Sequence, residues 1–269
     1  MGDGAGQGGH NMTDKILIER AGAVTTLRLN DPATMNSLTP AMARELHELL
    51  VQEAKTARAI VLAGSARAFS TGANLKAAMP EDIANFDVGE TLEQDYNPLM
   101  LAIRDSPVPL VSAVSGAAAG VGASIALLCD IIVAGRDAYF LEAFARIGLI
   151  PDGGATWLLT RAVGRVRAME MMLLAEKIPA SQAFDWGLIT RLVDNGTVEA
   201  TAIEIAQRLA DGPSSSLALI RRAAWSAADS DFESTLGHER DWQKQAGETS
   251  DFAEGLAAFL EKRAPRFNT

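Results

Sequence analysis

Residues 109–135, PLVSAVSGAAAGVGASIALLCDIIVAG, pass from one apolar run through a glycine-rich turn into another apolar run. The opening PLVSAVSG is typical of a buried strand, and SGAAAGVGAS has residues small enough for a tight turn and a closely packed helix. CDIIVAG, at 129–135, predicts a second buried strand. A strand, a helix and a further apolar strand predict a parallel sheet with helices against its faces, which is an α/β fold.

The length of this apolar run raises the question of a membrane span. Residues 109–129 carry no charge and approach the roughly 20 residues that cross a bilayer. The glycines and serines fit a strand, a turn and a helix better, and no positively charged loop flanks the run to orient it. We therefore expect no association with a membrane.

Outside this run, the hydrophobic pattern predicts alternating elements followed by helices. The N-terminal part predicts a hairpin, a helix and a short buried strand, at 15–30, 40–56 and 59–64. From Ala155 onward the chain predicts mostly helix, including 197–211, 214–227 and 249–262. No internal sequence repeat is visible.

These patterns divide the chain into three parts. Residues 1–12, MGDGAGQGGHNM, are glycine-rich and lack the apolar stretch of a signal peptide, so they predict a disordered leader or a remnant of cloning. Residues 13–195 form the predicted mixed αβ core, and residues 196–269 a helical C-terminal region.

The composition narrows the classes of partner and the compartment. The formal net charge of -10 over 269 residues argues against nucleic-acid binding, which needs clustered Lys and Arg. The single cysteine, Cys129, excludes an internal disulfide and fits a reducing, cytoplasmic location. Because it lies in an apolar run, we interpret Cys129 as a core residue.

Two glycine-rich loops are candidate ligand contacts. SGAAAGVGAS, at 115–124, matches neither G-x-G-x-x-G nor G-x-x-x-x-G-K-[ST], so a nucleotide site is weakly supported. The glycines could instead serve close packing of the helix on the sheet. They could also let a ligand carbonyl approach two backbone N–H groups, with FSTGANL, at 69–75, as the second loop of an oxyanion hole.

Asp152, in ARIGLIPDGGATWLLTR at 145–161, admits two interpretations. Asp is a preferred N-cap, and a helix is expected from about Ala155. Alternatively, a carboxylate among apolar residues is poorly solvated, which strengthens it as a base.

Four segments resemble, in order and spacing, the signature segments of the enoyl-CoA hydratase/isomerase, or crotonase, superfamily. They are ARAFSTGANLK, AVSGAAAGVGASIALLCDIIVAG, IGLIPDGGATWLLTRAVG and FLEKRAPRF. The resemblance covers nearly all of the chain from Met12 and implies a crotonase-like spiral of ββα units. It also implies a helical C-terminal trimerisation region, and a homotrimer or a hexamer built as a dimer of trimers.

The resemblance further implies an acyl-CoA thioester substrate. Its oxygen would bind the backbone N–H groups of Ala73 and Val121, which follow Gly72 and Gly120, and these donors would stabilise an enolate. Coenzyme A is then part of the substrate, so no separate cofactor and no metal are expected.

The reaction depends on which acids are present. The two glutamates with which hydratases of the family activate water fall on Ser124 and Phe144, neither of which can take a proton from water. The nearest acid is Glu142, two residues before Phe144. Residues two apart share a face of a strand, so a rotated geometry could bring Glu142 toward the site. We expect it instead to be solvated or in a salt bridge.

Asp152 lies where several isomerases and a dehalogenase branch carry an aspartate, and IPDGGATW resembles the PDSGGTW-type segment of phenylacetate-pathway isomerases. We therefore expect an enoyl-CoA isomerase that shifts a double bond with one Asp as acid and base. The alternatives are a hydratase with atypical residues, an aryl-CoA dehalogenase, for which Phe144 lacks the usual hydrogen-bond donor, and an inactive acyl-CoA binder.

Other residues are expected to contact the substrate. Lys76 matches a position that binds CoA phosphates, and the tail supplies Lys262, often to a neighbouring subunit, with Arg263 beside it. Met35 and Ser37 lie in the loop that usually borders the adenine and ribose. Ser124 and Phe144 would line the acyl site.

Overall fold

The computed structural model describes residues 15–78 and 87–267, so the predicted leader lies outside the described residues. The strands are β1 (Ile16–Ala21), β2 (Val24–Leu29), β3 (Ala59–Ala63), β4 (Ala68–Ser70), β5 (Leu110–Val114), β6 (Ala117–Ala119), β7 (Ile131–Gly135), β8 (Tyr139–Leu141), β9 (Ile178–Pro179) and β10 (Arg191–Val193). The helices are α1 (Pro40–Glu53), α2 (Leu75–Ala78), α3 (Val88–Thr91), α4 (Asn97–Arg104), α5 (Val121–Leu128), α6 (Ala155–Ala162), α7 (Gly164–Leu174), α8 (Ala180–Asp185), α9 (Val198–Ala210), α10 (Ser214–Ala227), α11 (Phe232–Gly247) and α12 (Ser250–Glu261).

The strands form two sheets. The larger has the order β1-β2-β3-β5-β7-β10, in which only the β1–β2 hairpin is antiparallel. The smaller has the order β4-β6-β8-β9, with β4, β6 and β8 parallel. The α/β prediction from residues 109–135 is confirmed, since this run forms β5, β6, α5 and β7.

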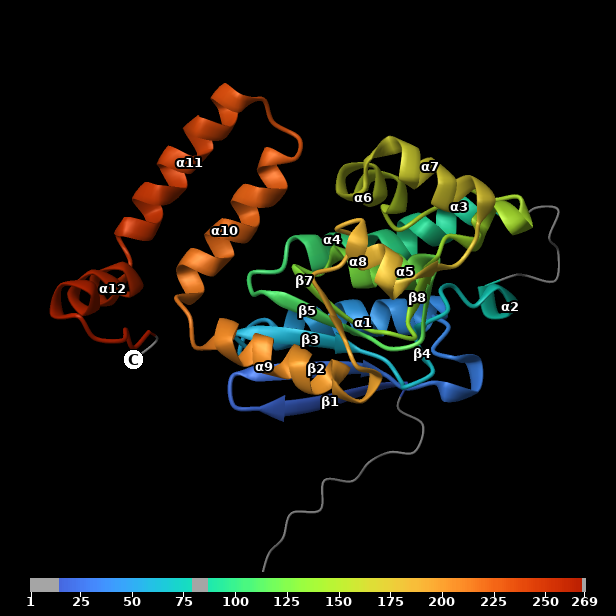
Figure 1. Cartoon of the computed structure of the whole chain (residues 1–269), viewed down its shortest axis with the longest axis horizontal. Helices are drawn as coiled ribbons and strands as arrows, with labels where there is room; N and C mark the ends of the chain where they lie inside the picture. The colour runs from blue at the N-terminus through green and yellow to red at the C-terminus, as the bar shows by residue number, and fades with distance from the viewer. Residues whose placement is uncertain (1–14, 79–86, 268–269) are drawn as a thin grey trace, which may run out of the picture.

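Successive turns of the chain repeat one pattern in space. β3, β5 and β7 each add a strand to the larger sheet, and the strand that follows each of them, β4, β6 and β8, adds one to the smaller sheet. Helices then carry the chain back to begin the next turn (Figure 1). This is the spiral of ββα units that the family resemblance implied, although the sequence shows no matching repeat.

Both faces of the larger sheet are buried, which explains its continuous apolar strands. In β3, Ile60 and Leu62 face the core shared with α1, α4 and α5, whereas Ala59, Val61 and Ala63 face α9. The α9 stripe that covers this second face has small residues four apart, at Ala202, Ala206 and Ala210. Small side chains let α9 pack closely, so this helix is part of the core's packing although it follows residue 195.

The predicted N-terminal elements are confirmed. Residues 15–30 form the hairpin of β1 and β2, with Gly22 at φ 60° in its turn. The helix predicted at 40–56 is α1, whose Thr39 side chain accepts the backbone N–H of Met42, as an N-cap does.

The C-terminal region departs from the prediction in one respect. Helices α9, α10 and α12 lie where they were predicted, and α11 joins them. The expectation of almost uninterrupted helix after Ala155 missed two short strands. The two-residue β9 adds an edge strand to the smaller sheet, and the three-residue β10 adds one to the larger sheet. Strands this short leave no periodic signal.

Helices α10, α11 and α12 form an arm beside the sheets (Figure 1). Arg221 fastens α10 to the core: it is buried, its Nε donates to Asp130 Oδ2 over 2.6 Å, and its Nη2 donates to the Ile103 carbonyl over 3.1 Å. A third bond joins its Nη1 to the Ser106 carbonyl.

The apolar run at 109–129 is divided between two strands and the eight-residue α5, all buried. No helix among residues 15–78 and 87–267 is long and apolar enough to cross a membrane. Cys129 is buried at the end of α5, as predicted for a core residue, and burial raises the pKa of its thiol.

Candidate active site

The two glycine-rich loops meet. Gly72, at φ 89°, lies so near the second loop that a Cβ atom on it would be 2.6 Å from the Ala119 carbonyl oxygen. A Cβ on Gly120, at φ 50°, would lie 4.0 Å from the Gly72 Cα. Both positions combine a positive φ with a close backbone approach, so glycine is required for the contact.

The backbone N–H of Ala73 is directed away from its neighbouring strand. Leu38 N donates to the Gly72 carbonyl over 2.8 Å, and Asn74 N donates to the Leu38 carbonyl over 2.7 Å. This parallel bridge uses the groups on either side of Ala73 and leaves its own N–H on the opposite side. Ala73 N is left without a hydrogen-bond acceptor among the described residues.

The backbone N–H of Val121 lies in the first turn of α5, where helical N–H groups have no partner within the helix. The preceding Gly120 provides no side chain to cap it. The positive end of the helix dipole adds to the N–H group as a donor toward developing negative charge. The loops therefore bring the N–H groups of both predicted oxyanion-hole residues to one place in the fold.

A third loop, at residues 31–37, is attached to the first. Thr71 N donates to the Met35 carbonyl over 3.2 Å, and Asn74 Nδ2 donates to Ser37 Oγ over 3.0 Å. Met35 and Ser37, predicted near the adenine and ribose, thus lie beside the Gly72–Ala73 loop.

Asn36 holds this third loop in place, a role that the sequence reasoning missed. It is fully buried, and its amide group bonds the carbonyls of Ala68 and Phe69 and the backbone N–H of Asp31. Its φ of 57° is a left-handed conformation that Asn tolerates better than most residues. Asn36 stands between Met35 and the polar Ser37, so no apolar pattern in the sequence signals its burial.

Asp152 does not cap the helix that follows it. Helix α6 begins at Ala155, its N-cap position is Gly154 at φ 82°, and no side chain accepts from its first turn. The two glycines, Gly153 at φ 59° and Gly154, place Asp152 a full turn before the helix. The capping interpretation is therefore wrong. Of the carboxylate, Oδ1 is buried and has no hydrogen-bond partner.

The backbone at Asp152 is held against the start of α5. Ser124 is fully buried, and its Oγ donates to the Asp152 carbonyl over 3.1 Å. A Cβ on Gly153 would lie 2.9 Å from the Ser124 Cβ and 3.1 Å from the Val121 Cγ2. The backbone that carries the acid is therefore attached to α5, the helix whose first residue supplies the Val121 N–H group.

Replacing Ser124 with alanine tests this attachment. We expect a loss of about 1 kcal/mol of stability from one buried hydrogen bond, and a fall of about tenfold in kcat from a less fixed carboxylate. Melting temperature and steady-state kinetics measure the two effects. Ser112→Ala is the matched control, since its Oγ donates to the Ala126 carbonyl of the same helix over 3.0 Å, away from Asp152. Equal loss of kcat in both variants would contradict the assignment.

Glu142 is neither solvated nor in a salt bridge, which corrects the sequence-based expectation. Only 1% of it is exposed, and both carboxyl oxygens are buried without a hydrogen-bond partner. It follows the last residue of β8, Leu141, whose carbonyl accepts the Gly120 N–H over 2.9 Å. Glu142 therefore stands beside the Gly120–Val121 peptide.

Phe144, two residues further on, packs over the same glycine. Its ring Cζ would be 3.4 Å from a Cβ atom on Gly120. The side chain is buried and apolar, so it supplies shape to the site and no proton.

The two acids titrate above their ordinary range. Burial raises the pKa of Asp152 to about 6. Burial, together with the negative charge of Asp152, raises the pKa of Glu142 to about 8. Burial, Asp152 and Asp95 also raise the pKa of Tyr96, whose hydroxyl donates to the Leu38 carbonyl over 2.8 Å. Asp152, Glu142 and Tyr96 thus share one poorly solvated region.

The residues predicted to contact CoA do not all lie close to one another in the single chain. Lys76 is exposed on α2, just after the Ala73 loop. Lys262 is exposed at the end of α12, in the arm and on the other side of the molecule from α2 (Figure 1). Arg263 pairs with Glu254 and Glu261 over 2.6 Å each. One chain alone therefore does not bring its tail to the site.

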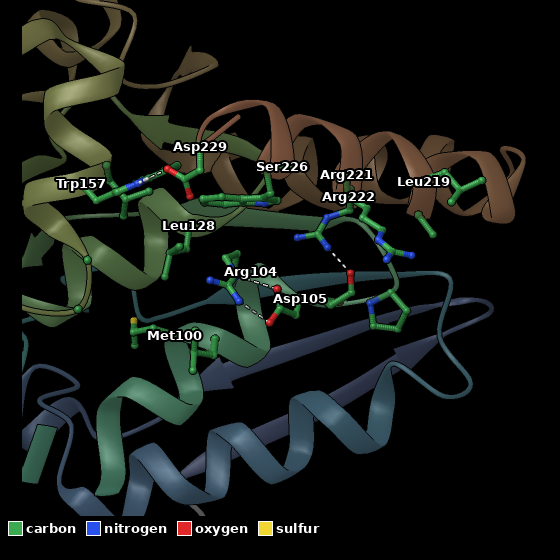
Figure 2. A pocket seen from close by; sticks show the side chains of 18 of the residues that line it. Met100, Arg104, Asp105, Leu128, Trp157, Leu219, Arg221, Arg222, Ser226 and Asp229 are labelled. Atoms are coloured by element: carbon green, nitrogen blue, oxygen red, sulfur yellow. Dashed lines mark hydrogen bonds and ion pairs between the residues drawn. The ribbon is translucent and has the colours of Figure 1, made fainter. Parts of the chain in front are cut away.

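A separate cavity of about 900 Å³ lies between α10 and the core (Figure 2). Stacked Trp157 and Trp225, with ring centroids 5.3 Å apart, form part of its wall. It borders Gly153 and Gly154, but Asp152, Glu142 and the two oxyanion donors do not line it. Elsewhere in the described residues, no group of three or more His, Cys, Asp or Glu side chains is placed to hold a metal ion.

Comparison with known proteins agrees with the geometry. The model of the enoyl-CoA hydratase/isomerase family matches residues 19–269. The 1,2-epoxyphenylacetyl-CoA isomerase of Escherichia coli (strain K12) is 41% identical over 259 residues, covering 95% of this chain and 99% of that protein. A protein of Rhodobacter capsulatus named as a probable enoyl-CoA hydratase is also 41% identical, over 94% of this chain and 97% of that one.

The fold has matching solved structures. The crystal structure of an enoyl-CoA hydratase from Polaromonas sp. JS666 superposes with a TM-score of 0.87 at 32% identity, covering 94% of this chain and 99% of that chain. The spiral of two sheets with C-terminal helices is therefore the crotonase fold. The chain belongs to the enoyl-CoA hydratase/isomerase family of acyl-CoA enzymes.

Proposed function

We propose that the chain is an enoyl-CoA isomerase in which Asp152 moves a proton while the N–H groups of Ala73 and Val121 hold the thioester oxygen. The observation that carries the proposal is the carboxylate of Asp152, whose buried Oδ1 has no hydrogen-bond partner and whose backbone is tied to α5. Such a group is costly to keep in a fold. Its attachment to the helix that begins at Val121 gives it a chemical use in the proposed reaction.

The proposed shift starts from a 3-enoyl thioester. The two N–H groups bond the carbonyl oxygen, which makes the C2 protons more acidic and stabilises the negative charge that forms there. The carboxylate of Asp152 takes a proton from C2, and the electrons move into a dienolate. A proton added at C4 then gives the conjugated 2-enoyl thioester. One acid-base group suffices for this sequence, whereas hydration generally recruits two.

Gly72, Gly120 and Phe144 are proposed to shape the space around the thioester and acyl group. Lys76, Met35 and Ser37 are proposed to contact the CoA moiety, and Lys262 to do so from a neighbouring subunit. Ser124 is proposed to act through Asp152, because its hydroxyl is already bonded to that residue's carbonyl.

A screen of 3-enoyl, 2-enoyl and aryl-derived CoA thioesters tests the function. We expect conversion of 3-enoyl-CoA to 2-enoyl-CoA, followed by absorbance of the conjugated thioester and by mass spectrometry. Binding of acyl-CoA without turnover of any substrate would overturn the proposal, as would halide release from a halogenated aryl-CoA as the only reaction.

A hydratase is the second candidate, because the buried Glu142 and the half-buried Asp152 provide two acids close enough for the charge of one to raise the pKa of the other. A relative that is 41% identical carries a hydratase name. The same screen separates the candidates, since hydration of a 2-enoyl thioester adds the mass of one water.

The pH profile is a further prediction. Asp152 acts as a base only when ionised, and burial raises its pKa to about 6. The value of kcat/KM is therefore expected to rise with pH, by about tenfold per pH unit below 6, and to level off between pH 6 and the pKa of about 8 to which burial raises Glu142. An exposed Asp would give a rise near pH 4 instead, following its ordinary pKa of about 3.9. Initial rates between pH 4.5 and 9, with a check that the fold persists, measure the profile.

We also propose that the chain assembles as a homotrimer or hexamer in a reducing, cytoplasmic setting. Apolar side chains remain exposed on the arm in the single chain, at Ile220, Phe232, Leu236, Phe252, Leu256, Phe259 and Leu260. Contiguous exposed apolar surface of this kind is typical of an interface. Light scattering after size exclusion is expected to give three or six times the 28.5 kDa of one chain.

A further inference from the structure

Glu142 has no structural explanation within the chain. A carboxyl group with only 1% exposure and no partner for either oxygen destabilises a fold whether it is charged or neutral. Other buried acids do have partners: Glu53 accepts from Arg20 Nε over 2.8 Å, and Asp251 accepts from the Ser215 N–H. Glu142 is therefore in position for a group that the chain does not itself supply.

The backbone contacts of Glu142 and Asp152 indicate where a bound substrate group would lie between them. The bond from Gly120 N to the Leu141 carbonyl places Glu142 alongside the peptide that carries the Val121 N–H. Gly153 packs on the Val121 side chain, and the Ser124 hydroxyl donates to the Asp152 carbonyl. Asp152 therefore lies against the start of α5, although it follows β8, as Glu142 does. The two acids thus flank one oxyanion donor.

The two acids differ in their readiness to ionise. Asp152 is partly exposed and its pKa is raised by burial alone, whereas Glu142 is buried further and also faces the charge of Asp152. Tyr96, the other titratable group whose pKa Asp152 raises, keeps its proton and donates a hydrogen bond to the Leu38 carbonyl. At neutral pH Asp152 is the carboxylate and Glu142 the carboxylic acid, as expected for two like charges that share a dry site.

We propose that Glu142 is a second catalytic residue, the acid that returns a proton to C4 after Asp152 has removed one from C2. This inference rests on the isomerase function proposed above and assigns the second half of its reaction. Two different groups then serve the two carbons, so neither carboxyl has to travel from C2 to C4.

The step balances without another reactant. The C2–H bond breaks and its proton forms an O–H bond on Asp152, while the electron pair moves into the dienolate. The Glu142 O–H bond then breaks, its proton forms the C4–H bond, and the dienolate electrons reform the thioester carbonyl. Afterwards Asp152 holds a proton and Glu142 a charge, and exchange with water, which takes the proton from Asp152 and returns one to Glu142, resets the pair.

Isotope labelling distinguishes two acids from one. The substrate is a 3-enoyl-CoA that carries deuterium at C2, turned over in ordinary water under initial-rate conditions, with the label in the product located by NMR and mass spectrometry. With Glu142 as donor, the deuterium taken from C2 remains on Asp152 while another proton enters C4, so little label appears at C4. With Asp152 alone, part of the label moves from C2 to C4.

Glu142→Met and Glu142→Gln remove the acid, while methionine and glutamine keep a side chain of similar length. We expect each to lower kcat by about 10²-fold, the lower end of what proton transfer by a positioned acid contributes, and to raise label transfer from C2 to C4. The melting temperature should stay equal or rise, since an unpartnered buried carboxyl is removed. Exposed Glu170→Gln is the control for loss of a carboxylate elsewhere.

The outcomes separate this inference from the function on which it rests. Loss of rate with increased C2-to-C4 transfer in both Glu142 variants supports it. Wild-type label distribution in the two variants overturns it, whatever their rates, while leaving Asp152 as the isomerase base. Absence of isomerisation by the wild-type chain overturns the proposed function itself.

Discussion

Replacing Asp152 with asparagine is expected to lower kcat for 3-enoyl-CoA isomerisation by about 10³-fold, within the range for a positioned acid-base group. Asparagine has nearly the same shape but takes no proton from carbon. KM should change little, because the thioester oxygen and the CoA moiety are bound by other groups. The stability of the folded state should not decrease. The raised pKa shows that the folded state disfavours the ionised carboxylate, so above pH 6 the variant should melt at the same or a higher temperature.

Steady-state kinetics and thermal melting at pH 8 check both parts. Asp185→Asn, in an exposed position of α8, is the matched control and should keep the wild-type rate and melting temperature. A rate for Asp152→Asn within threefold of wild type would remove Asp152 from the mechanism. A large fall in its melting temperature would instead assign the carboxylate a structural role.

Replacing Arg221 with alanine is expected to cost about 3 kcal/mol of stability, since its buried guanidinium group makes three hydrogen bonds, each worth about 1 kcal/mol. The variant removes the guanidinium donor from the carbonyls of Ile103 and Ser106 and from the carboxylate of Asp130, whose Oδ2 keeps the Leu110 N–H. For a chain of this size the loss corresponds to a fall of about 6–12 °C in melting temperature. Figure 2 shows Arg221 on α10 at the wall of the large cavity, reaching toward the core.

The neighbouring Arg222→Ala is the control. Arg222 is exposed and lies over the Trp242 ring at 5.2 Å, an interaction within the arm, so its loss should cost less than about 1 kcal/mol. Thermal and urea melts measure both variants. Equal effects would show that α10 is held to the core by apolar packing, with no special contribution from the buried guanidinium group.

The sequence predicted the fold wherever an element carried an apolar run or an apolar period. β1 to β3, α1, β5, α5 and β7 were predictable for this reason, and the α/β class followed, whereas the three-residue β6 was taken for part of a turn. The short strands β9 and β10 were not readable, because two or three residues pair with a sheet only when the rest of the chain has already formed it. The repeating spiral appeared only through the family resemblance.

Only part of the candidate site could be predicted from the sequence. The glycine loops could be predicted as candidate ligand contacts, and only the family resemblance assigned Ala73, Val121 and Asp152 to the site. The capping interpretation of Asp152 failed because two glycines in left-handed conformations delay α6. Glu142 was misjudged because the chain leaves β8 at that residue, at φ -96° and ψ 80°, and strand alternation no longer states where the side chain points. Apolar residues on both sides, in YFLEAF, were the available signal of burial.

The spiral has a chemical consequence of its own. Ala73 follows β4, Val121 follows β6, and Glu142 and Asp152 follow β8, so three consecutive turns each contribute their groups at the same stage of the turn. In the proposed mechanism, two of these turns bind the thioester and the third transfers protons. Substitutions after β8 would then change the proton chemistry without changing the groups that bind the thioester.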